Sequence, residues 1–390
     1  MLTELTLESF KCFSKLRLPL APLTILSGLN ASGKSTVLQA LSILHQTIAT
    51  NEHSTRLLLN GPTINLGTAS EVIDNVSGRD SFRIELEWLG AHRYGWTMQS
   101  DDRHSDLAIP IESVMVQEAD QNEAEVFRVR QRGLLKLLPE GVRSNRPIGQ
   151  QLSESLERLT YISADRIGPR DTYPTAIPGE QINVGVRGEY APWFLSAYAD
   201  RPALPGLALK EEPPRLPQQV NAWMRRFFPG AQVRVNLLRE ANATILQMGT
   251  QGDVHRPQNV GFGLTHVLPI LVACLGAREG DLLLIENPES HLHPAGQSMM
   301  GRFLARAAAA GAQVILETHS DHVLNGVRLA IKEDALSPTE QVVIHFFVPR
   351  GDERRAQVTS PLIDSQGNLD HWPEGFFDQF DKDNSSLIGW

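Results

Sequence analysis

The chain has 390 residues, of which 41% are hydrophobic and 21% charged, and this ordinary globular composition excludes a wholly disordered protein. Its 36 basic and 45 acidic residues give a net charge of −9, so any contact with nucleic acid has to be a local basic patch. Two distant cysteines, Cys12 and Cys274, exclude a disulfide framework and a cysteine zinc cluster and favour a reducing, cytoplasmic location. We expect neither a signal peptide nor a membrane segment, because the longest apolar run, 264–277, is too short to cross a bilayer.

The N-terminal third predicts strands around one helix. Residues 2–10 alternate apolar and polar side chains, 23–28 form an apolar run that ends in glycine, and 34–48 have apolar residues at helical spacing. Alternation returns at 81–89, 93–99 and 112–117, which predicts antiparallel strands in a β-rich insertion over 80–158. Within it, we expect 128–146 to form a solvated β face.

The rest of the chain predicts a strand, a proline-rich and helical insertion over 168–230, and then regular alternation. The first strand lies within 159–166, helical pieces lie near 193–198 and 220–228, and 232–238 with 242–249 predict a hairpin. After these come a helix at 261–275, a strand at 281–286, a helix at 297–310, a strand at 313–320 and a helix at 322–333. Such alternation predicts a parallel sheet with right-handed crossovers.

Residues 28–36, GLNASGKST, match the phosphate-binding loop G-x-x-x-x-G-K-[ST]. The glycines permit a turn that aims backbone N–H groups inward, and the following helix adds its positive dipole end. Lys34 would reach the β- and γ-phosphates of ATP, and the Ser35 hydroxyl would bind Mg²⁺. The predicted nucleotide-binding residues are Gly28, Asn30, Ala31, Ser32, Gly33, Lys34, Ser35 and Thr36.

Acidic and histidine residues follow two strands that we expect to be neighbours. Glu286 ends the apolar run 281–286, where nucleotide hydrolases hold Mg²⁺ with a carboxylate. The segments ESHLHP (289–294) and ETHSDH (317–322) offer ligands for a metal-hydrolase site. We favour instead a histidine that senses the γ-phosphate from the second strand end, because the phosphate loop already occupies this edge of the sheet.

Taken in order, GLNASGKST, NVGFGLTHVLPIL, LLLIENPESHLHP and VILETHSDHVLNGVRLAIK resemble the ABC-type ATPase head of the SMC/RecF/OLD-like branch, often called the AAA family ATPases. The stretch WPEGFFDQF (372–380) resembles a short tail domain of unknown function found in one prokaryotic subgroup. The resemblance covers 1–45 and 159–390. It implies an α/β fold of the P-loop NTPase class, with an ABC-ATPase-like core over 1–80 and 159–345 and a tail domain over 346–390.

The resemblance also implies roles for single residues. Glu286 stands where the family has its magnesium-side carboxylate, and His319 matches the switch histidine that touches the γ-phosphate. Lys11 lies where the family places adenine-contacting residues. The signature motif, which in the family caps the ATP of the opposite protomer, is represented by Gly261, Gly263 and Thr265.

Two departures from the ABC pattern are visible. Asn287 occupies the position of the usual general base, and an amide cannot accept a proton at neutral pH. Glu289 or His319 would then polarise the water, and we expect slow hydrolysis with ATP acting mainly as a clamp. In addition, residues 60–72 contain no glutamine for the usual magnesium-and-water loop and offer only Asn60, Asn65 and Thr68.

Two groups of basic residues are candidates for contact with nucleic acid or a partner, with salt bridges or a solvated surface as the alternatives. One group follows the strand within 159–166 and consists of Arg166 and Arg170. The other consists of Arg128, Arg130, Arg132, Lys136, Arg143 and Arg146.

By the resemblance, we expect an ATP- and Mg²⁺-dependent ATPase that dimerises through ATP-sandwiched heads and gates a separately encoded effector in prokaryotic anti-phage defence or genome maintenance. One alternative is a DNA-stimulated repair or recombination ATPase of the RecF-like type. Another is a metal-dependent hydrolase that uses the histidine clusters.

Overall fold

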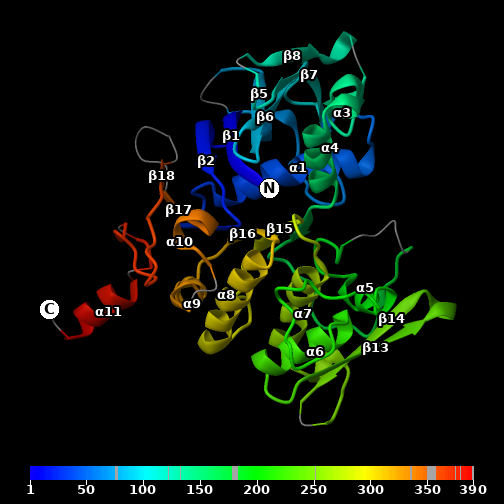
Figure 1. The fold of residues 1–390 in the computed structure, drawn as a ribbon, viewed down its shortest axis with the longest axis vertical. Helices are drawn as coiled ribbons and strands as arrows, with labels where there is room; N and C mark the ends of the chain where they lie inside the picture. The colour runs from blue at the N-terminus through cyan, green and yellow to red at the C-terminus, as the bar shows by residue number, and fades with distance from the viewer. Residues whose placement is uncertain are drawn as a thin grey trace. The chain divides into compact units, whose positions relative to one another are not determined.

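The computed structural model describes residues 1–74, 78–121, 123–131, 133–177, 183–250, 252–333, 336–348, 357–373, 375–377 and 379–388. The chain divides into two compact units, each described by itself (Figure 1). Unit 1 comprises residues 1–21, 27–159 and 345–360, and unit 2 comprises residues 22–26, 160–344 and 361–390.

Unit 1 is built on an antiparallel sheet with strand order β2-β1-β5-β6-β7-β4, in which β7 also pairs with β8. The predicted strands at 2–10, 81–89, 93–99 and 112–117 are confirmed, and the last three extend the N-terminal hairpin into one sheet because β1 pairs with β5. The strands are β1 (Leu2–Phe10), β2 (Phe13–Pro19), β4 (Arg56–Leu58), β5 (Ser81–Trp88), β6 (His92–Gln99), β7 (Ala108–Gln117) and β8 (Glu125–Arg128).

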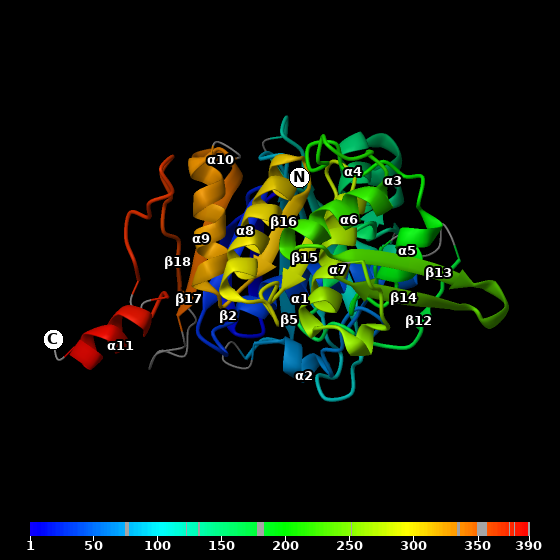
Figure 2. The same ribbon diagram turned by 90° about the horizontal axis from the view of Figure 1, so that it is seen from below.

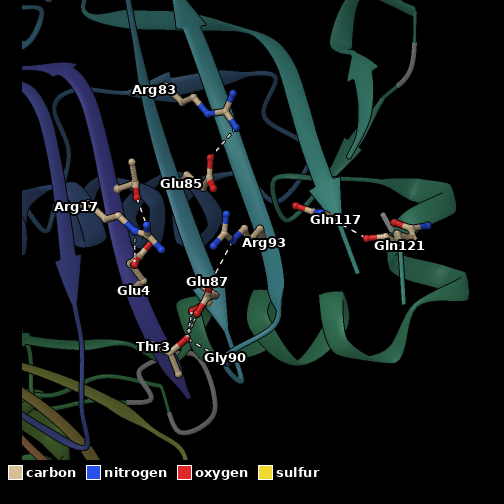
Figure 3. Close-up of polar contacts among 11 residues, drawn as sticks. Thr3, Glu4, Arg17, Arg83, Glu85, Glu87, Gly90, Arg93, Gln117 and Gln121 are labelled. Carbon is tan, nitrogen blue, oxygen red and sulfur yellow. Dashed lines mark hydrogen bonds and ion pairs between the residues drawn. The ribbon is translucent and has the colours of Figure 1, made fainter. Parts of the chain in front are cut away.

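The two faces of this sheet differ in polarity, as expected when only one face is buried. Alternate residues such as Leu5, Leu7 and Leu86 are fully buried. Figure 3 shows polar residues of this sheet, which form an array of ion pairs. One of these joins Arg17 Nε to Glu4 at 2.6 Å. Such exposed pairs contribute at most about 1 kcal/mol each, so the buried face holds the sheet together.

The helices of unit 1 are α1 (Lys34–Thr50), α2 (Ala69–Val72), α3 (Glu140–Asn145) and α4 (Pro147–Glu157). The predicted helix at 34–48 is confirmed by α1, whose His45 Nδ1 lies 2.8 Å from the Leu156 carbonyl oxygen of α4. The stretch 128–146 is not one β face. It contains the end of β8, the 3-10 turn η1 (Val129–Gln131), a two-residue hairpin of β9 (Leu134–Leu135) and β10 (Leu138–Pro139), and α3.

Unit 2 contains the predicted parallel sheet, in the order β11-β15-β16-β3. Its strands are β11 (Thr160–Ile162), β15 (Leu282–Glu286), β16 (Gln313–Glu317) and β3 (Leu23–Gly28), of which the first four residues of β3 belong to this unit. The predicted helices of the last third are confirmed as α7 (Phe262–Gly276), α8 (Pro294–Ala309) and α9 (Asp321–Lys332). The chain thus has the predicted α/β fold of a P-loop NTPase.

Helices α8 and α9 lie side by side in direct backbone contact (Figure 2). A Cβ atom added to Gly301 of α8 would lie 2.1 Å from the Val323 carbonyl oxygen, and one added to Gly326 of α9 would lie 2.0 Å from the Ser298 carbonyl oxygen. Only glycine at both positions permits this approach.

The predicted helical pieces and the hairpin of unit 2 are also confirmed. Strand β17 (Val342–Val348), which pairs antiparallel with β18 (Gln357–Thr359), was not predicted. The remaining elements are β12 (Tyr173–Pro174), α5 (Ala191–Ala197), α6 (Leu216–Phe227), β13 (Gln232–Leu238), η2 (Arg239–Ala241), β14 (Ala243–Gly249), η3 (Pro257–Asn259), α10 (Pro338–Gln341) and α11 (Gln379–Ile388). In the described part of the chain, no helix combines the length and apolar character that a bilayer crossing requires.

Candidate functional site

The predicted phosphate loop joins β3 to α1, and its shape depends on two glycines. Gly28 has φ +136°, and a Cβ there would lie 2.2 Å from the Phe347 carbonyl oxygen. Gly33 has φ +103°, and its Cβ would lie 2.7 Å from Cys12 Sγ. L-residues with side chains rarely adopt such φ values, so both positions require glycine.

The loop curls around the Lys34 side chain. The buried Lys34 Nζ donates hydrogen bonds to the Gly28 and Leu29 carbonyl oxygens at 2.8 and 2.7 Å. Ser32 Oγ donates to the same Leu29 oxygen at 2.7 Å, and the N-cap residue of α1, Gly33, has no side chain to cap the first turn. The loop therefore holds an ammonium group at the start of a 17-residue helix. Such an arrangement can bind a phosphate group.

The other predicted residues of this half surround the loop. Asn30 and Ala31 are exposed, Ser35 is half-buried at the start of α1, and Thr36 is buried. Ser35 thus stays a predicted Mg²⁺ ligand. Lys11 Nζ donates to Gln39 Oε1 of α1 at 2.6 Å, and burial lowers the pKa of Lys11.

In unit 2, Glu286 is held at the end of β15 by two donors. The Tyr161 hydroxyl donates to Glu286 Oε1 at 2.8 Å, and the Ala164 N–H donates to Oε2 at 3.0 Å. Burial and the charge of Glu286 raise the pKa of Tyr161, so the phenol stays protonated as a donor. The carboxylate keeps further lone pairs for a cation, which suits its predicted role toward Mg²⁺.

The structure contradicts both sequence-based interpretations of Arg166, an exposed contact with nucleic acid or a partner and a surface salt bridge. This side chain is buried and makes neither a surface salt bridge nor an exposed anion contact. Its Nη1 and Nη2 donate to the carbonyl oxygens of Glu286 and Asn287, each at 2.7 Å. Burial lowers the pKa of Arg166 to about 10, so the guanidinium remains charged at neutral pH. Arg166 therefore clamps the chain where β15 ends, whereas Arg170 is exposed.

Asn287 adopts a left-handed backbone conformation, with φ +41°. Its N–H donates to the Glu317 carbonyl oxygen of β16 at 2.8 Å. Asn tolerates this conformation better than most residues. The amide at the position of the usual general base thus also suits the backbone of the turn.

Glu289 connects the turn after β15 to the end of β16. Its carboxylate oxygens accept hydrogen bonds from the Thr318 hydroxyl at 2.8 Å and from the His319 N–H at 2.9 Å. The His319 side chain is exposed. The structure therefore brings Glu286, Asn287, Glu289 and His319 together at neighbouring strand ends of one sheet. Which of them activates water stays a prediction.

The predicted signature turn lies at the N-terminus of α7. Gly261 and Phe262 are exposed, and Phe262 has 54% of its surface accessible. A Cβ on Gly263 would lie 2.9 Å from the His291 carbonyl oxygen. Thr265 is buried, and its hydroxyl donates to the Phe262 carbonyl oxygen at 2.8 Å. Thr265 thus fixes the turn from inside, and its contact with a partner's ATP stays a prediction.

A histidine pair, not predicted from the sequence, joins this turn to the segment after β15. The rings of His266 and His291 are 4.4 Å apart, and the Phe262 ring lies 5.5 Å from that of His291. Burial, followed by the charge of Arg166, lowers the pKa of His266 to about 4, so this imidazole is neutral at pH 7. The sequence does not predict this pair, because His266 and His291 are distant in the chain. They meet only when α7 packs on the segment after β15.

The residues considered for a magnesium-and-water loop are largely occupied in holding their own segment. Asn60 exchanges two side-chain hydrogen bonds with the backbone of Gly67, at 2.8 and 2.9 Å. Thr68 forms a capping box with Glu71 at the start of α2. Asn65 is exposed.

The basic stretch divides into paired and exposed residues. Lys136 Nζ pairs with Glu157 at 2.7 Å, and Arg146 pairs with Glu125 at 2.5 Å, so neither belongs to a continuous basic surface. Arg128 and Arg130 are exposed. Arg132 and the side chain of Arg143 lie outside the described residues.

The histidine clusters give no metal site in the part of the chain that the structure describes. There, no three His, Cys, Asp or Glu side chains are arranged to hold a metal ion. The metal-hydrolase alternative therefore lacks a ligand set among these residues.

Comparisons with known proteins cover most of the chain. Residues 1–88 match a family model described as "AAA ATPase domain", and residues 191–325 match one described as "AAA domain, putative AbiEii toxin, Type IV TA system". Residues 338–387 match "Protein of unknown function (DUF3696)". A search of curated proteins finds no match.

Similar solved structures include three SMC heads. The SMC head domain from Thermotoga maritima is 11% identical with a TM-score of 0.45, over 93% of this chain and 99% of that chain. The Smc head with an extended coiled coil bound to the C-terminal domain of ScpA, from Pyrococcus furiosus, is 12% identical with a TM-score of 0.45, over 99% of both chains. An Smc head bound to the C-winged helix domain of ScpA is 13% identical with a TM-score of 0.48, over 92% and 97%.

One AAA match contains the phosphate loop, and the other runs from α5 into α9 across Glu286 and His319. Residues 1–88 and 191–325 thus each match a family model of AAA-type ATPase domains, which supports ATPase function in general.

Proposed function

We propose that this protein binds ATP with Mg²⁺, closes into a head-to-head dimer, and reopens through slow hydrolysis. In this way it gates a separately encoded effector in prokaryotic anti-phage defence or genome maintenance. The observation that carries the slow turnover is Asn287, an amide held in a left-handed turn next to Glu286. A positioned base is worth about 10²–10⁴ in rate, so its replacement favours binding over turnover.

The nucleotide would be held by the residues already described. Backbone N–H groups of the phosphate loop and the Lys34 ammonium would bind the phosphates, and Ser35 and Glu286 would hold Mg²⁺. The bound cation would neutralise charge on the phosphates. Glu289 and His319 would orient the attacking water.

Dimerisation is supported by the exposed N-terminus of α7. Gly261 and Phe262 face solvent at the start of a 15-residue helix, the kind of backbone that binds an anion. In a two-fold dimer each such turn would lie over the partner's ATP. The "Type IV TA system" in the description of the family matched by 191–325 supports a role in defence.

A direct experiment measures phosphate release and light scattering for wild type, Lys34→Ala, Asn287→Asp and Glu289→Gln. Aspartate is the sharper substitution at 287, because it keeps the size of asparagine and tolerates φ +41°. We expect ATP-induced dimers, slow turnover in wild type, and faster turnover in Asn287→Asp. Lys34→Ala should abolish both signals. Fast wild-type turnover that Glu289→Gln eliminates would instead indicate an ATP-driven motor.

The alternative is a DNA-stimulated ATPase. Fewer basic residues are available to bind DNA than the sequence suggested, because Lys136, Arg146 and Arg166 are engaged within the chain. Arg128, Arg130 and Arg170 remain exposed. Turnover that rises with duplex DNA, and DNA affinity that falls steeply with salt, would favour this alternative.

A further inference from the structure

A pocket with a volume of about 480 Å³ opens in the antiparallel sheet of unit 1. It lies where β4, β7 and β8 meet, and Ile111 and Val129 form an apolar part of its wall. None of the phosphate-loop residues 28–36 lines it. Pockets of this size hold small molecules.

The sheet creates this pocket through an irregularity in β7. The first part of β7 pairs with β4, ending at Pro110 opposite Arg56, and its later part pairs with β8 from Ser113 onward. Against β6, the register shifts so that Thr97 faces Ser113 and Met98 faces Ile111, which leaves Glu112 as an extra, bulged residue. Bulges occur where a strand re-aims a side chain, often beside functional sites.

The charges around the pocket are not balanced internally. Arg128 and Arg130 are exposed, and neither side chain makes a hydrogen bond or ion pair with another described residue. Arg56 is oriented by a hydrogen bond to the Ala108 carbonyl oxygen and by Asp106 at 3.6 Å. Of the three guanidinium groups that line the pocket, Arg56 therefore has an ion-pair partner, and those of Arg128 and Arg130 have none among the described residues.

We propose that this pocket binds a small phosphorylated ligand of sugar-phosphate or mononucleotide size, as a second ligand site separate from the phosphate loop. Arg128 and Arg130 would bind the phosphate, because guanidinium groups match its geometry with paired hydrogen bonds. The carboxylates of Asp101 and Glu112 accept hydrogen bonds from the hydroxyl groups of a sugar, and Thr55 and Gln99 add neutral polar contacts.

The pocket favours a small molecule over a nucleic-acid strand. Its shape is concave and local, whereas a strand needs a basic groove that follows several phosphates. Lys136 and Arg146, which could have extended such a groove, are paired with Glu157 and Glu125. No aromatic side chain lines the pocket among the described residues, so it lacks a platform on which bases would stack.

The test uses the full chain with its ATP site filled by Mg²⁺ and ADP, and calorimetric titration with ribose 5-phosphate and with cytidine 5′-monophosphate. The variant is the double substitution Arg128→Glu and Arg130→Glu. Its matched control is Arg239→Glu, an exposed arginine on the turn between β13 and β14. A thermal unfolding scan of each variant verifies that it is folded.

We expect at least one probe to bind wild type and the Arg239→Glu control equally. The double variant should lose about tenfold or more in affinity, because it replaces both guanidinium groups that would bind the phosphate with negative charges. The proposal is overturned if neither probe binds, or if the folded double variant binds as wild type does. Binding of a duplex or single-stranded oligonucleotide through the two arginines, without binding of either small phosphate, would also overturn it.

Discussion

The guanidinium of Arg166 and the backbone carbonyl of Asn287 are joined by a hydrogen bond of 2.7 Å between Nη2 and the oxygen. The second nitrogen, Nη1, binds the Glu286 carbonyl oxygen in the same way. One buried cation thus fixes two consecutive peptide groups at the end of β15. The direction of the Glu286 and Asn287 side chains therefore depends on a residue that binds their backbone carbonyl groups.

Arg166→Met should lower the free energy of unfolding by about 2–4 kcal/mol, because two partly buried carbonyl oxygens lose their charged donor. Denaturant unfolding of the variant measures this loss. Arg170→Met is the matched control, since Arg170 is exposed, and its change should stay within about 0.5 kcal/mol. Equal stability of the two variants would contradict the clamp.

Gly28→Ala should lower the free energy of unfolding by about 2–4 kcal/mol and abolish ATP binding, because its Cβ overlaps the Phe347 carbonyl and its φ is positive. Gly141→Ala is a suitable control, since no atom lies within 4 Å of the added Cβ and φ is not positive. Its stability should be unchanged or higher by up to about 1 kcal/mol. Thermal unfolding and nucleotide titration distinguish the two, and normal ATP affinity in Gly28→Ala would refute the assigned loop geometry.

Phe262→Ala should weaken ATP-induced dimerisation by about tenfold while leaving ATP binding to the monomer unchanged, if this exposed ring packs on the partner head. Light scattering at graded protein concentrations gives the dimer affinity. Leu107→Ala removes an equally exposed apolar side chain from unit 1 and should have no effect. Weakening of the same size in Leu107→Ala would point to a general surface effect.

Stability should fall as the pH drops from about 6.5 towards 4. The folded-state pKa values of His266 and His345 are both lowered from 6.5 to about 4, mainly by burial. The unfolded chain therefore takes up these protons first, so the stabilisation is complete above pH 6.5 and is lost as the pH approaches 4. His266→Phe should reduce the slope over this window in pH-dependent denaturant unfolding, whereas substitution of the exposed His53 by Gln should not. An unchanged slope in His266→Phe would show that the pKa of His266 is not lowered in the native state.

The local patterns of the sequence were sufficient for the loop and the main strands. The phosphate loop needs glycines at fixed positions, and the buried strands 23–28, 281–286 and 313–317 are short apolar runs, so both could be predicted from neighbouring residues alone. Asn287 was also identified, because it interrupts a recognisable acidic pair.

What the sequence did not reveal depends on pairings between distant segments. Arg166 follows a three-residue strand, and its burial arises only because β11 pairs with β15 more than a hundred residues later. The same holds for His266 and His291. The arginine pocket depends on a shift of one residue in the register of β7, and its trace in the sequence is a break in the apolar alternation between Ile111 and Val114.

The glycine contact between α8 and α9 has a mechanical consequence. Where backbone meets backbone at Gly301 and Gly326, no layer of side chains remains that could slide or change rotamer. The two helices must therefore translate and rotate as one rod. Because α9 begins at Asp321, two residues after His319, a shift of that strand end would move both helices together.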